Sequence, residues 1–381
     1  MNANKACHYI NGKLVCSAGG RIGKVYNPST GEQIYEVDLA SAQEADQAVK
    51  AASQAFEGWA KLTVTRRIEI LHKFRQLLDQ SRKELAEVIC MENGKTYSDA
   101  LAEIARSLEA VDFAYHAPHL LKGEYSMQVG GDIDVYSIRQ PIGVVIGIGP
   151  FNFPVMGPIS TTTFAMICGN TVVWKASEKV PKSSLYLADL WTKAGLPDGV
   201  LNVIQGDKEA VDALIRHPLT AGVHFVGSTR VAEYVYGEAA KHHKRVVAFG
   251  GGKNHMVIMP DADMDQSVNA FLGAAYGSAS QRCMAVSVAV LVGEKTAKAF
   301  CEKLIPQVKT LKVGPWNSES DYGALISREA KENVERAIER AVEQGARVLV
   351  DGRGLKVPGH ENGFYLGPTL LDQVTTDMDI Y

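Results

Sequence analysis

Five short apolar segments between residues 143 and 249 constrain the fold of this chain more than any other feature. Each is apolar on both faces, and most are separated from the next by a helix-length segment. Strands of this kind are typical of a parallel sheet that is covered by helices on both sides. We predict such a sheet from residues 143–148, 171–174, 200–204, 223–226 and 245–249, with helices over 183–194 and 208–215.

The residues before this sheet are predicted to form short strands and then helices. The first forty hold strands and turns, among them a hairpin-like Asn11-Gly12. Ser41-Ala42-Gln43-Glu44 is a capping box, and apolar residues at helical spacing follow it. Further helices are predicted from Thr65, over 83–91 and over 98–121, the last interrupted by Pro118.

Two later parts of the chain differ from the parallel sheet. Residues 132–140 alternate polar and apolar side chains, which predicts a strand with one buried side. Beyond Lys253 a second α/β unit is predicted, with its strands and helices over 255–259, 264–275, 286–292, 295–311, 328–344, 347–350 and 368–374. The chain stops at Tyr381 without a polar tail or a capped helix, so we expect this second unit to be incomplete.

The composition is that of a globular protein of two or three domains. With 381 residues and a net charge of −3, the chain offers no strongly basic surface for nucleic acid or an anionic membrane. No apolar run is long enough to span a bilayer, and the N-terminus lacks the core of a secretory signal. The six cysteines show no C-x-x-C pair, so we expect reduced thiols in a cytoplasmic protein, without disulfides. No cysteine or histidine spacing indicates a metal site.

Cys283 is the candidate nucleophile. It follows a run of small and flexible residues, so its thiol is expected to be accessible, as a nucleophile must be. A buried, inert cysteine is the alternative on local grounds. Asn152 lies in Pro150-Phe-Asn-Phe-Pro154, where a rigidly held amide suits an oxyanion donor. An Asx-turn residue in a proline-rich loop is the alternative there.

Ligands of parallel α/β sheets bind in the loops at the carboxyl ends of the strands. The common dinucleotide fingerprint is absent, because Gly147-Ile-Gly149 lacks the third glycine. Gly227-Ser228-Thr229 ends a strand and opens a helix, which favours an anion, although a simple N-cap is the alternative. Lys175 and Glu178 follow a strand and suit ribose hydroxyls, although most such charges are only surface charges.

Taken in order, these loops resemble the aldehyde dehydrogenase superfamily from about Tyr9 to the last residue. The shared motifs are Pro150-Phe-Asn-Phe-Pro154, Lys175-x-Ser-Glu178, Phe225-Val-Gly-Ser-Thr229, Gly251-Gly-Lys253 and Gln281-x-Cys283. Gly252-Lys-Asn-His-x-Val-Ile-Met-Pro-Asp-Ala262 and Gln281-Arg-Cys-Met-Ala285 look like the CoA-acylating methylmalonate-semialdehyde dehydrogenase branch.

The resemblance implies an aldehyde dehydrogenase fold with two parallel-sheet α/β domains. An NAD-binding domain would cover 1–121 and 141–252, an oligomerisation strand segment 122–140, and a partial catalytic domain 253–381. Cys283 would attack the aldehyde, while the Asn152 amide and the Cys283 N–H hold the oxyanion. The residues implied to line the NAD site are Gly149, Phe151, Lys175, Glu178, Lys179, Ser228 and Gly250.

One departure from the family pattern bears on the reaction. Hydrolytic members carry a glutamate four residues before the Gly-Gly-Lys lysine, where this chain has Phe249. Phenylalanine abstracts no proton from water, so acyl transfer to coenzyme A, already a strong nucleophile, is favoured. Arg282 and Arg106 match a basic pair for the substrate carboxylate, which a guanidinium suits. A surface charge on a helix is the alternative for Arg106.

We therefore expect NAD-dependent oxidation of a carboxylated semialdehyde, such as methylmalonate or malonate semialdehyde. The product would be an acyl-CoA, formed through a cysteine thioester with decarboxylation. Hydrolytic aldehyde oxidation and a catalytically silent, truncated NAD-binding relative are the alternatives. The expected partners are the aldehyde and CoA, with no nucleic acid, membrane or metal, and full-length relatives are expected to be homo-oligomers.

Overall fold

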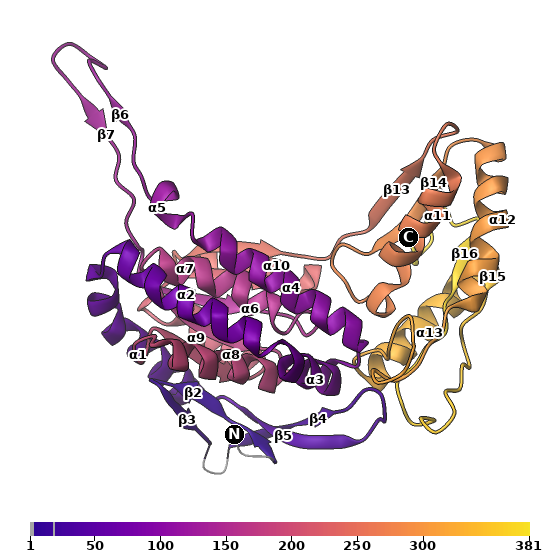
Figure 1. Cartoon of the computed structure of the whole chain (residues 1–381), viewed down its shortest axis with the longest axis horizontal. Coiled ribbons are helices and arrows are strands. Elements are labelled where there is room, and N and C mark those ends of the chain that lie inside the picture. Colours follow the sequence, from indigo (N-terminus) through magenta and orange to yellow (C-terminus); the bar gives the residue numbers. More distant parts are fainter. Residues whose placement is uncertain (1–3, 18–19) are drawn as a thin grey trace. The chain divides into compact units, whose positions relative to one another are not determined.

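The computed structural model describes residues 4–17 and 20–381 (Figure 1). The chain divides into two compact units. The first comprises Met1–Val25, Tyr35–Val88 and Leu101–Gly250, and the second comprises Tyr26–Ile34, Ile89–Ala100 and Gly251–Tyr381. Residues 1–3, on which part of the expectation about the N-terminus rests, lie outside the described residues.

A seven-stranded sheet with the order β12-β11-β8-β9-β10-β2-β3 forms the centre of the first unit. Five of its strands pair in parallel, as predicted: β8 (Val144–Ile148), β9 (Thr171–Ala176), β10 (Leu201–Gln205), β11 (Thr220–Val226) and β12 (Arg245–Phe249). The hairpin of β2 (His8–Ile10) and β3 (Lys13–Val15) joins β10 in the antiparallel direction. Since β9 and β11 flank β8 on opposite sides, the winding direction reverses between β8 and β11.

Helices cover both faces of this sheet, which is why its strands are apolar on both faces. With the right-handed crossovers that are the rule for parallel strands, the strand order places α8 (Pro181–Ala194) on one face, and α9 (Lys208–Arg216) and α10 (Thr229–Lys241) on the other. α1 (Ala42–Lys61) shares a buried core with α9 and α10 and begins at the predicted Ser41/Glu44 capping box. α2 (Val64–Gln80) packs on α8, where Phe74 stacks on Trp191 with ring centroids 3.7 Å apart.

Shorter elements complete this part of the chain. β1 (Lys5–Ala6), β5 (Gln33–Leu39) and β4 (Arg21–Tyr26) form a small sheet in that order. The helices that follow α2 are α3 (Arg82–Asn93), α4 (Tyr97–Ala114) and α5 (Ala117–Leu120), so the predicted interruption at Pro118 falls in the first turn of α5. In the part of the chain that is described, no helix is both long and apolar enough to cross a membrane.

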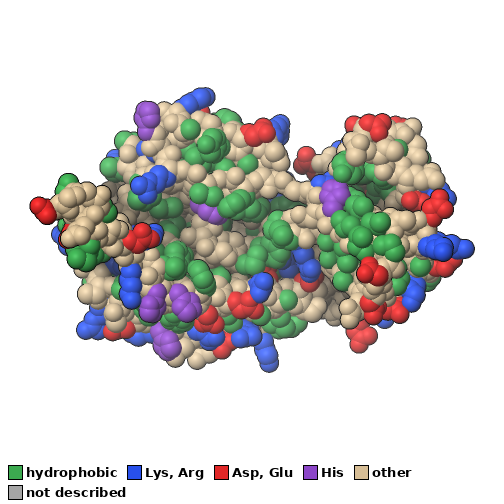
Figure 2. Space-filling view, turned by 90° about the horizontal axis from the view of Figure 1, so that it is seen from above, with side chains coloured by type: hydrophobic (Ala, Val, Ile, Leu, Met, Phe, Trp, Pro, Cys, Tyr) green, Lys and Arg blue, Asp and Glu red, His purple; other side chains and the backbone are tan. Residues whose placement is uncertain are grey.

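A two-stranded antiparallel ribbon of β6 (Tyr125–Ser126) and β7 (Val135–Tyr136) projects from α5 (Figure 1). The predicted strand over 132–140 is therefore wrong in its length and in its buried side, because residues 122–140 are exposed throughout. Alternating side chains become half-buried only where a second layer covers one face. In Figure 2 the left-hand end of the molecule, which holds the ribbon, presents hydrophobic side chains beside acidic ones.

The second unit holds two separate strand pairs. β13 (Asn254–Ile258) and β14 (Val286–Leu291) are parallel, and α11 (Met264–Tyr276) and α12 (Glu294–Thr310) pack on them. β15 (Arg347–Val350) and β16 (Leu370–Asp372) are antiparallel, which differs from the expected parallel sheet. α13 (Arg328–Glu343) precedes β15, and all these helices lie within two residues of their predicted bounds.

Two early segments pack in the second unit, although the sequence assigned them to the first domain. The main-chain N–H of Ala324 donates to the carbonyl of Gly94 at 3.0 Å. Phe364 donates in the same way to Pro28 at 2.9 Å. These main-chain bonds join residues far apart in the sequence, and no local pattern encodes such a pairing.

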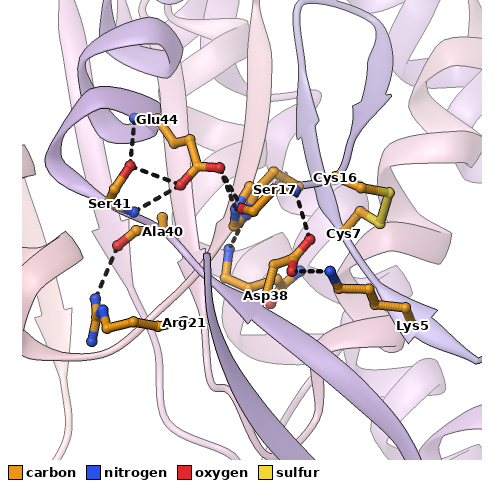
Figure 3. A network of polar contacts seen from close by, with 11 residues as sticks. Lys5, Cys7, Cys16, Ser17, Arg21, Asp38, Ala40, Ser41 and Glu44 are labelled. Atoms are coloured by element: carbon orange, nitrogen blue, oxygen red, sulfur yellow. Dashed lines mark hydrogen bonds and ion pairs between the residues drawn. A yellow bond between two sulfur atoms is a disulfide. The ribbon is translucent and has the colours of Figure 1, made fainter. Parts of the chain in front are cut away.

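Cys7 and Cys16 form a disulfide (Figure 3), so the expectation that all six cysteines are reduced thiols is wrong. The hairpin explains the pairing: its register sets His8 opposite Val15, and the two cysteines are the next residues outward on each strand. The other four cysteines of the described chain are free. Cys7, Cys16 and Asp38 are also the one close set of three potential metal ligands among the described residues, but both sulfurs are bonded to each other.

Candidate active site

The cofactor candidates of the first unit lie at the carboxyl edge of its parallel sheet. In the β-ladder, Ile148 of β8 pairs with Lys175 of β9 on one side and with Phe225 of β11 on the other. The loops after these three strands therefore begin next to one another. The reversal of the winding direction lies between β8 and β11, where open α/β sheets bind their ligands.

Lys175 is buried, with only 7% of its surface exposed. Its Nζ donates to the carbonyl of Gly206 at 3.1 Å and lies 3.9 Å from the Glu178 carboxylate. Burial lowers the pKa of Lys175 below the ordinary lysine value, while the charges of Glu178 and Asp207 act in the opposite direction. A buried ammonium held at a strand end has a fixed direction, so the surface-charge alternative does not describe Lys175.

Glu178 and Lys179 follow in the same loop. Glu178 is more exposed than Lys175, at 39% for its side chain. The Lys179 ammonium lies 5.9 Å from the centre of the Phe151 ring, so the loop after β9 approaches the loop after β8. The ends of β8 and β9 and the loops that follow them thus bring five of the seven predicted cofactor residues to one edge of the sheet.

Gly149 and Gly250 permit close approaches at this edge. A Cβ on Gly149 would lie 2.4 Å from the Trp174 ring of the neighbouring strand, so only glycine fits there. A Cβ on Gly250 would lie 3.1 Å from Thr229, the first residue of α10. Ser228 is the N-cap residue of α10 and is exposed, and its hydroxyl caps none of the described N–H groups of that helix. Ser228 thus occupies the N-cap position, but its side chain does not cap the helix, which was the alternative role for this residue.

Asn152 lies half-buried in the loop after β8. The chain downstream is anchored by Glu103 of α4, which is buried and accepts two main-chain hydrogen bonds through Oε1. The donors are Val155 at 2.8 Å and Met156 at 3.0 Å. They are the N-cap and the first residue of α6 (Met156–Pro158), which is followed by the short helices η1 (Ile159–Thr163) and α7 (Phe164–Ile167). Sequence reasoning missed Glu103, because nothing local distinguishes it from other glutamates of α4.

Cys283 lies in the second unit, in a β-turn between η2 (Gly277–Ser280) and β14. The turn is closed by the N–H of Ala285, which donates to the carbonyl of Arg282 at 3.1 Å. Cys283 is exposed, so the alternative of a buried cysteine does not describe it. The side chain of Asn254 donates to the carbonyls of Cys283 and Ala285, each at 2.9 Å. Sequence reasoning missed Asn254, although it stands inside a motif that carries the resemblance.

The two arginines have different surroundings. Arg282 Nη2 donates to Asp99 Oδ1 at 2.6 Å within the second unit, and its guanidinium lies where a side chain on Gly277 would be. This ion pair with Asp99 holds Arg282 beside the cysteine turn. Arg106 belongs to the first unit, is 70% exposed and pairs with Glu109 one turn along α4. A surface charge remains a sufficient description of Arg106.

Phe249 is the last residue of β12 and is 55% exposed. Its ring meets the edge of the His224 ring, with centroids 5.8 Å apart. His224 Nδ1 lies 3.3 Å from the Thr161 hydroxyl, and burial lowers the pKa of this histidine below its ordinary value. The position at which the resemblance leads us to expect a glutamate in hydrolytic members is thus occupied by a hydrocarbon ring.

A cavity of about 760 Å³ lies within the second unit. Its wall is mainly apolar and includes Ser280 and Gln281, which precede the cysteine turn. Among the described residues that line it, Cys283 does not occur. This cavity is therefore not assigned to the chemistry.

Comparison with known proteins decides the family. The model of the aldehyde dehydrogenase family matches residues 15–381. The chain belongs to the aldehyde dehydrogenase family. The resemblance inferred from the loop motifs is thereby confirmed, including its branch, since curated relatives at 40–50% identity carry malonate- or methylmalonate-semialdehyde dehydrogenase names.

Three members of the aldehyde dehydrogenase family illustrate the similarity. A malonate-semialdehyde dehydrogenase from Pseudomonas aeruginosa is 50% identical over 98% of this chain and 75% of its own length. The acylating, mitochondrial methylmalonate-semialdehyde/malonate-semialdehyde dehydrogenase of Homo sapiens is 42% identical over 98% of this chain and 70% of its own. The crystal structure of methylmalonate-semialdehyde dehydrogenase from Oceanimonas doudoroffii matches with a TM-score of 0.97 at 48% identity, over 99% of this chain and 78% of that one.

A further aldehyde dehydrogenase structure, from Sinorhizobium meliloti, was solved in complex with NAD. It matches with a TM-score of 0.96 at 48% identity, over 99% of this chain and 77% of that one. The aldehyde dehydrogenase fold expected from the sequence is confirmed by these similarities.

Proposed function

We propose that this chain is an NAD-dependent, CoA-acylating semialdehyde dehydrogenase. Its substrate would be malonate or methylmalonate semialdehyde, and its products an acyl-CoA, CO₂ and NADH. The observation that carries the proposal is the 50% identity, over nearly the whole chain, to a protein named malonate-semialdehyde dehydrogenase. The name of the human relative, which is 42% identical, describes that enzyme as acylating.

The exposed thiol of Cys283 supports its role as nucleophile. In the proposed step its sulfur forms a bond to the aldehyde carbon, and the carbonyl oxygen gains negative charge. The N–H of Cys283 and the side-chain amide of Asn152 are proposed to donate to that oxygen. Removal of hydride from the same carbon then leaves a thioester on Cys283. The bond between the α-carbon and the carboxylate breaks next, CO₂ leaves, and the electron pair that remains on the α-carbon takes up a proton.

The carboxyl edge of the first unit fits NAD. It offers the buried ammonium of Lys175 and the carboxylate of Glu178 for ribose hydroxyls. The exposed Ser228 supplies a hydroxyl at the N-terminus of α10, where the helix dipole favours a phosphate. Gly149, Phe151, Lys179 and Gly250 are proposed to line the same cleft. When bound, NAD supplies the hydride acceptor.

Phe249 supports transfer of the acyl group to coenzyme A. A water molecule needs a base to attack a thioester at neutral pH, and a phenyl ring offers none. A thiol is a stronger nucleophile and needs less help. The CoA sulfur would bond to the acyl carbon while the sulfur of Cys283 leaves, which restores the free enzyme. Arg282 is proposed to contact the substrate carboxylate, and Arg106 is retained as a second candidate.

The exposed ribbon of β6 and β7 supports a proposal of self-association. Its exposed side chains include Tyr125, Met127, Val135 and Tyr136, an unusual density of apolar groups for a free surface. We also propose that 1–121 with 141–252 bind NAD, that 122–140 serve in oligomerisation and that 253–381 serve in catalysis, although Tyr26–Ile34 and Ile89–Ala100 pack in the second unit. A cytoplasmic location is proposed because the nucleophile must be kept reduced, whereas the Cys7–Cys16 disulfide is of a kind that is rare in the cytosol.

The decisive experiment measures NADH formation from malonate semialdehyde with and without CoA, together with the acyl-CoA product by mass spectrometry. We expect turnover to require CoA and to vanish in Cys283→Ser but not in the matched variant Cys301→Ser. Equal turnover without CoA would establish the hydrolytic alternative. No turnover, with Cys283 alkylated no faster than Cys301, would establish the silent relative.

A further inference from the structure

The approach to the cysteine turn is strained. Three consecutive residues without glycine, Ser278, Ala279 and Ser280, have left-handed backbone conformations with φ of 55°, 52° and 62°. Each such residue costs about 1–2 kcal/mol relative to an ordinary conformation. Strain of this kind persists only where surrounding contacts determine the local structure. The contacts that hold Cys283 therefore need to be identified.

One contact lies before the turn, at Gln281. Its Oε1 accepts the N–H of Ile326 at 3.0 Å, and its Nε2 donates to the carbonyl of Ala324 at 3.3 Å. The other contact is Asn254, which is half-buried and opens β13 opposite Val286 of β14. Its Nδ2 carries two hydrogens, and both are used, one on the carbonyl of Cys283 and one on that of Ala285.

These bonds fix the direction of the main chain at the nucleophile. The Arg282 carbonyl accepts from Ala285, so the N–H of Cys283, in the same trans peptide plane, points to the opposite side of the turn. The next carbonyl, that of Cys283 itself, is held by Asn254. The two peptide planes that meet at the Cys283 Cα are therefore both held by hydrogen bonds.

We propose that Asn254 is the positioning residue of the nucleophile, and that it aims the Cys283 N–H at the developing oxyanion. The proposal rests on the proposed function for the role of Cys283 but adds a residue outside the reacting atoms. Asn254 touches neither aldehyde nor cofactor in this scheme. It acts by holding the turn, so its loss should slow reactions that build an oxyanion more than reactions that need only an accessible thiol.

Two reagents separate these two classes of reaction without NAD or CoA. p-Nitrophenyl acetate acylates a thiolate through a tetrahedral oxyanion and releases p-nitrophenolate. Iodoacetamide alkylates the same thiolate by displacement of iodide, with no oxyanion. The unmodified chain and its variants are compared in both reactions, and the rates in Cys283→Ser give the background from the other cysteines.

Asn254→Asp keeps the side-chain shape but removes both donated hydrogens. We expect its acylation to slow at least tenfold, in line with the about 10²–10³-fold cost of losing an oxyanion donor outright. Alkylation should stay within threefold of the unmodified chain. Asn333→Asp, the same change on exposed α13, should alter neither rate. Asn254→Gln retains the amide donors and should recover part of the acylation rate.

Acylation within threefold of the unmodified chain in Asn254→Asp would overturn the proposal. An equal fall of both rates would do so too, because it would mean a general collapse of the turn. If Asn254→Asp does not fold, Asn254→Ser, whose hydroxyl has only one hydrogen to donate, is judged by the same ratio of the two rates. The two rates can be measured whether or not the chain catalyses the proposed reaction. A lack of NADH formation by the unmodified chain would therefore refute the proposed function but not the role of Asn254.

Discussion

Glu103 Oε1 accepts the main-chain N–H of Val155 at 2.8 Å, so a buried carboxyl group on α4 fixes the chain three residues after Asn152. The same oxygen also accepts the N–H of Met156 at 3.0 Å. Both donors lie at the start of a helical segment, where main-chain N–H groups have no partner within the helix. The side chain of Glu103 thus does for the Asn152 loop what Asn254 does for the Cys283 turn.

Glu103→Ala is expected to lower the free energy of unfolding by about 2–3 kcal/mol, because buried donors lose their acceptor. It should also lower kcat, since the loop that carries Asn152 loses its anchor. Urea unfolding and the CoA-dependent assay measure the two effects. Glu57→Gln, which touches only a surface pair with Lys61, should stay within about 0.5 kcal/mol. An unchanged stability in Glu103→Ala would show that water replaces the carboxyl group.

His8 makes stability depend on pH. It is fully buried, and its Nδ1 accepts the N–H of Gln205 at 3.1 Å, which requires that nitrogen to be unprotonated. Burial lowers the pKa of His8 below 6.5, while Glu44 and Asp38 raise it and Lys5 lowers it further. Between the lowered pKa and 6.5 the unfolded chain binds more protons, so this contribution is present above 6.5 and is lost as pH falls.

In His8→Asn the free energy of unfolding is expected to fall less as the pH is lowered, because the asparagine Oδ1 can accept the same hydrogen bond without titrating. The difference in slope between the two proteins cannot exceed one proton, or about 1.4 kcal/mol per pH unit. Urea unfolding at pH 5.5 and 7.5 measures it. The exposed His119→Asn serves as the control and should leave the slope unchanged. If stability depends on pH equally in the unmodified chain, His8→Asn and His119→Asn, then His8 is not the source of the pH dependence.

The Cys7–Cys16 disulfide gives a third prediction. It closes a loop with a sequence separation of nine, which limits its contribution to about 2–3 kcal/mol, and less where the hairpin already orders the unfolded chain. Figure 3 shows Ser17, next in sequence to Cys16, reaching toward Asp38 and Glu44. Its N–H donates to Asp38 at 2.9 Å, and its hydroxyl donates to Glu44, the capping-box residue of α1. Reduction is therefore expected to loosen the start of α1 as well.

Thiol titration in denaturant should detect four cysteines without reductant and six with it. The melting temperature should fall when a reductant is added, because Cys16 is exposed to it. The double variant Cys7→Ser/Cys16→Ser should have the melting temperature of the reduced protein, and the reductant should not change it. Six reactive thiols before reduction would restore the expectation drawn from the sequence.

The parallel strands were predictable to within a few residues because strands buried on both faces admit few alternatives. The prediction for residues 132–140 was wrong. An alternation of polar and apolar side chains shows that the two faces of a strand differ, but it does not show whether another layer covers the apolar face. The Cys7–Cys16 pair could have been found: a two-residue Asn11-Gly12 turn sets residue 10 against 13, and so 7 against 16. That step needs a register, which the spacing of cysteines alone does not contain.

Some residues of the candidate site could likewise be predicted from the sequence, and others could not. Lys175, Gly149 and Ser228 could be placed because the ends of parallel strands share an edge. Asn254, Glu103 and Asp99 could not, because each acts through contacts with residues far away in the sequence. A long-range hydrogen bond to the main chain leaves no mark on the sequence of its main-chain partner, because nearly every residue carries the same main-chain groups.

Phe249→Glu tests why the acyl group is transferred to a thiol. The ring is 55% exposed at the end of β12, so a glutamate there is accommodated at little cost to stability. A carboxylate at this position could take a proton from the attacking water, and general base catalysis contributes about 10²–10⁴-fold. We expect CoA-independent NADH formation to rise at least tenfold, with release of the free acid. Phe249→Gln has a similar size but no basic oxygen and should not show the rise. Equal CoA-independent rates in both variants would mean that water is excluded for another reason than the missing base.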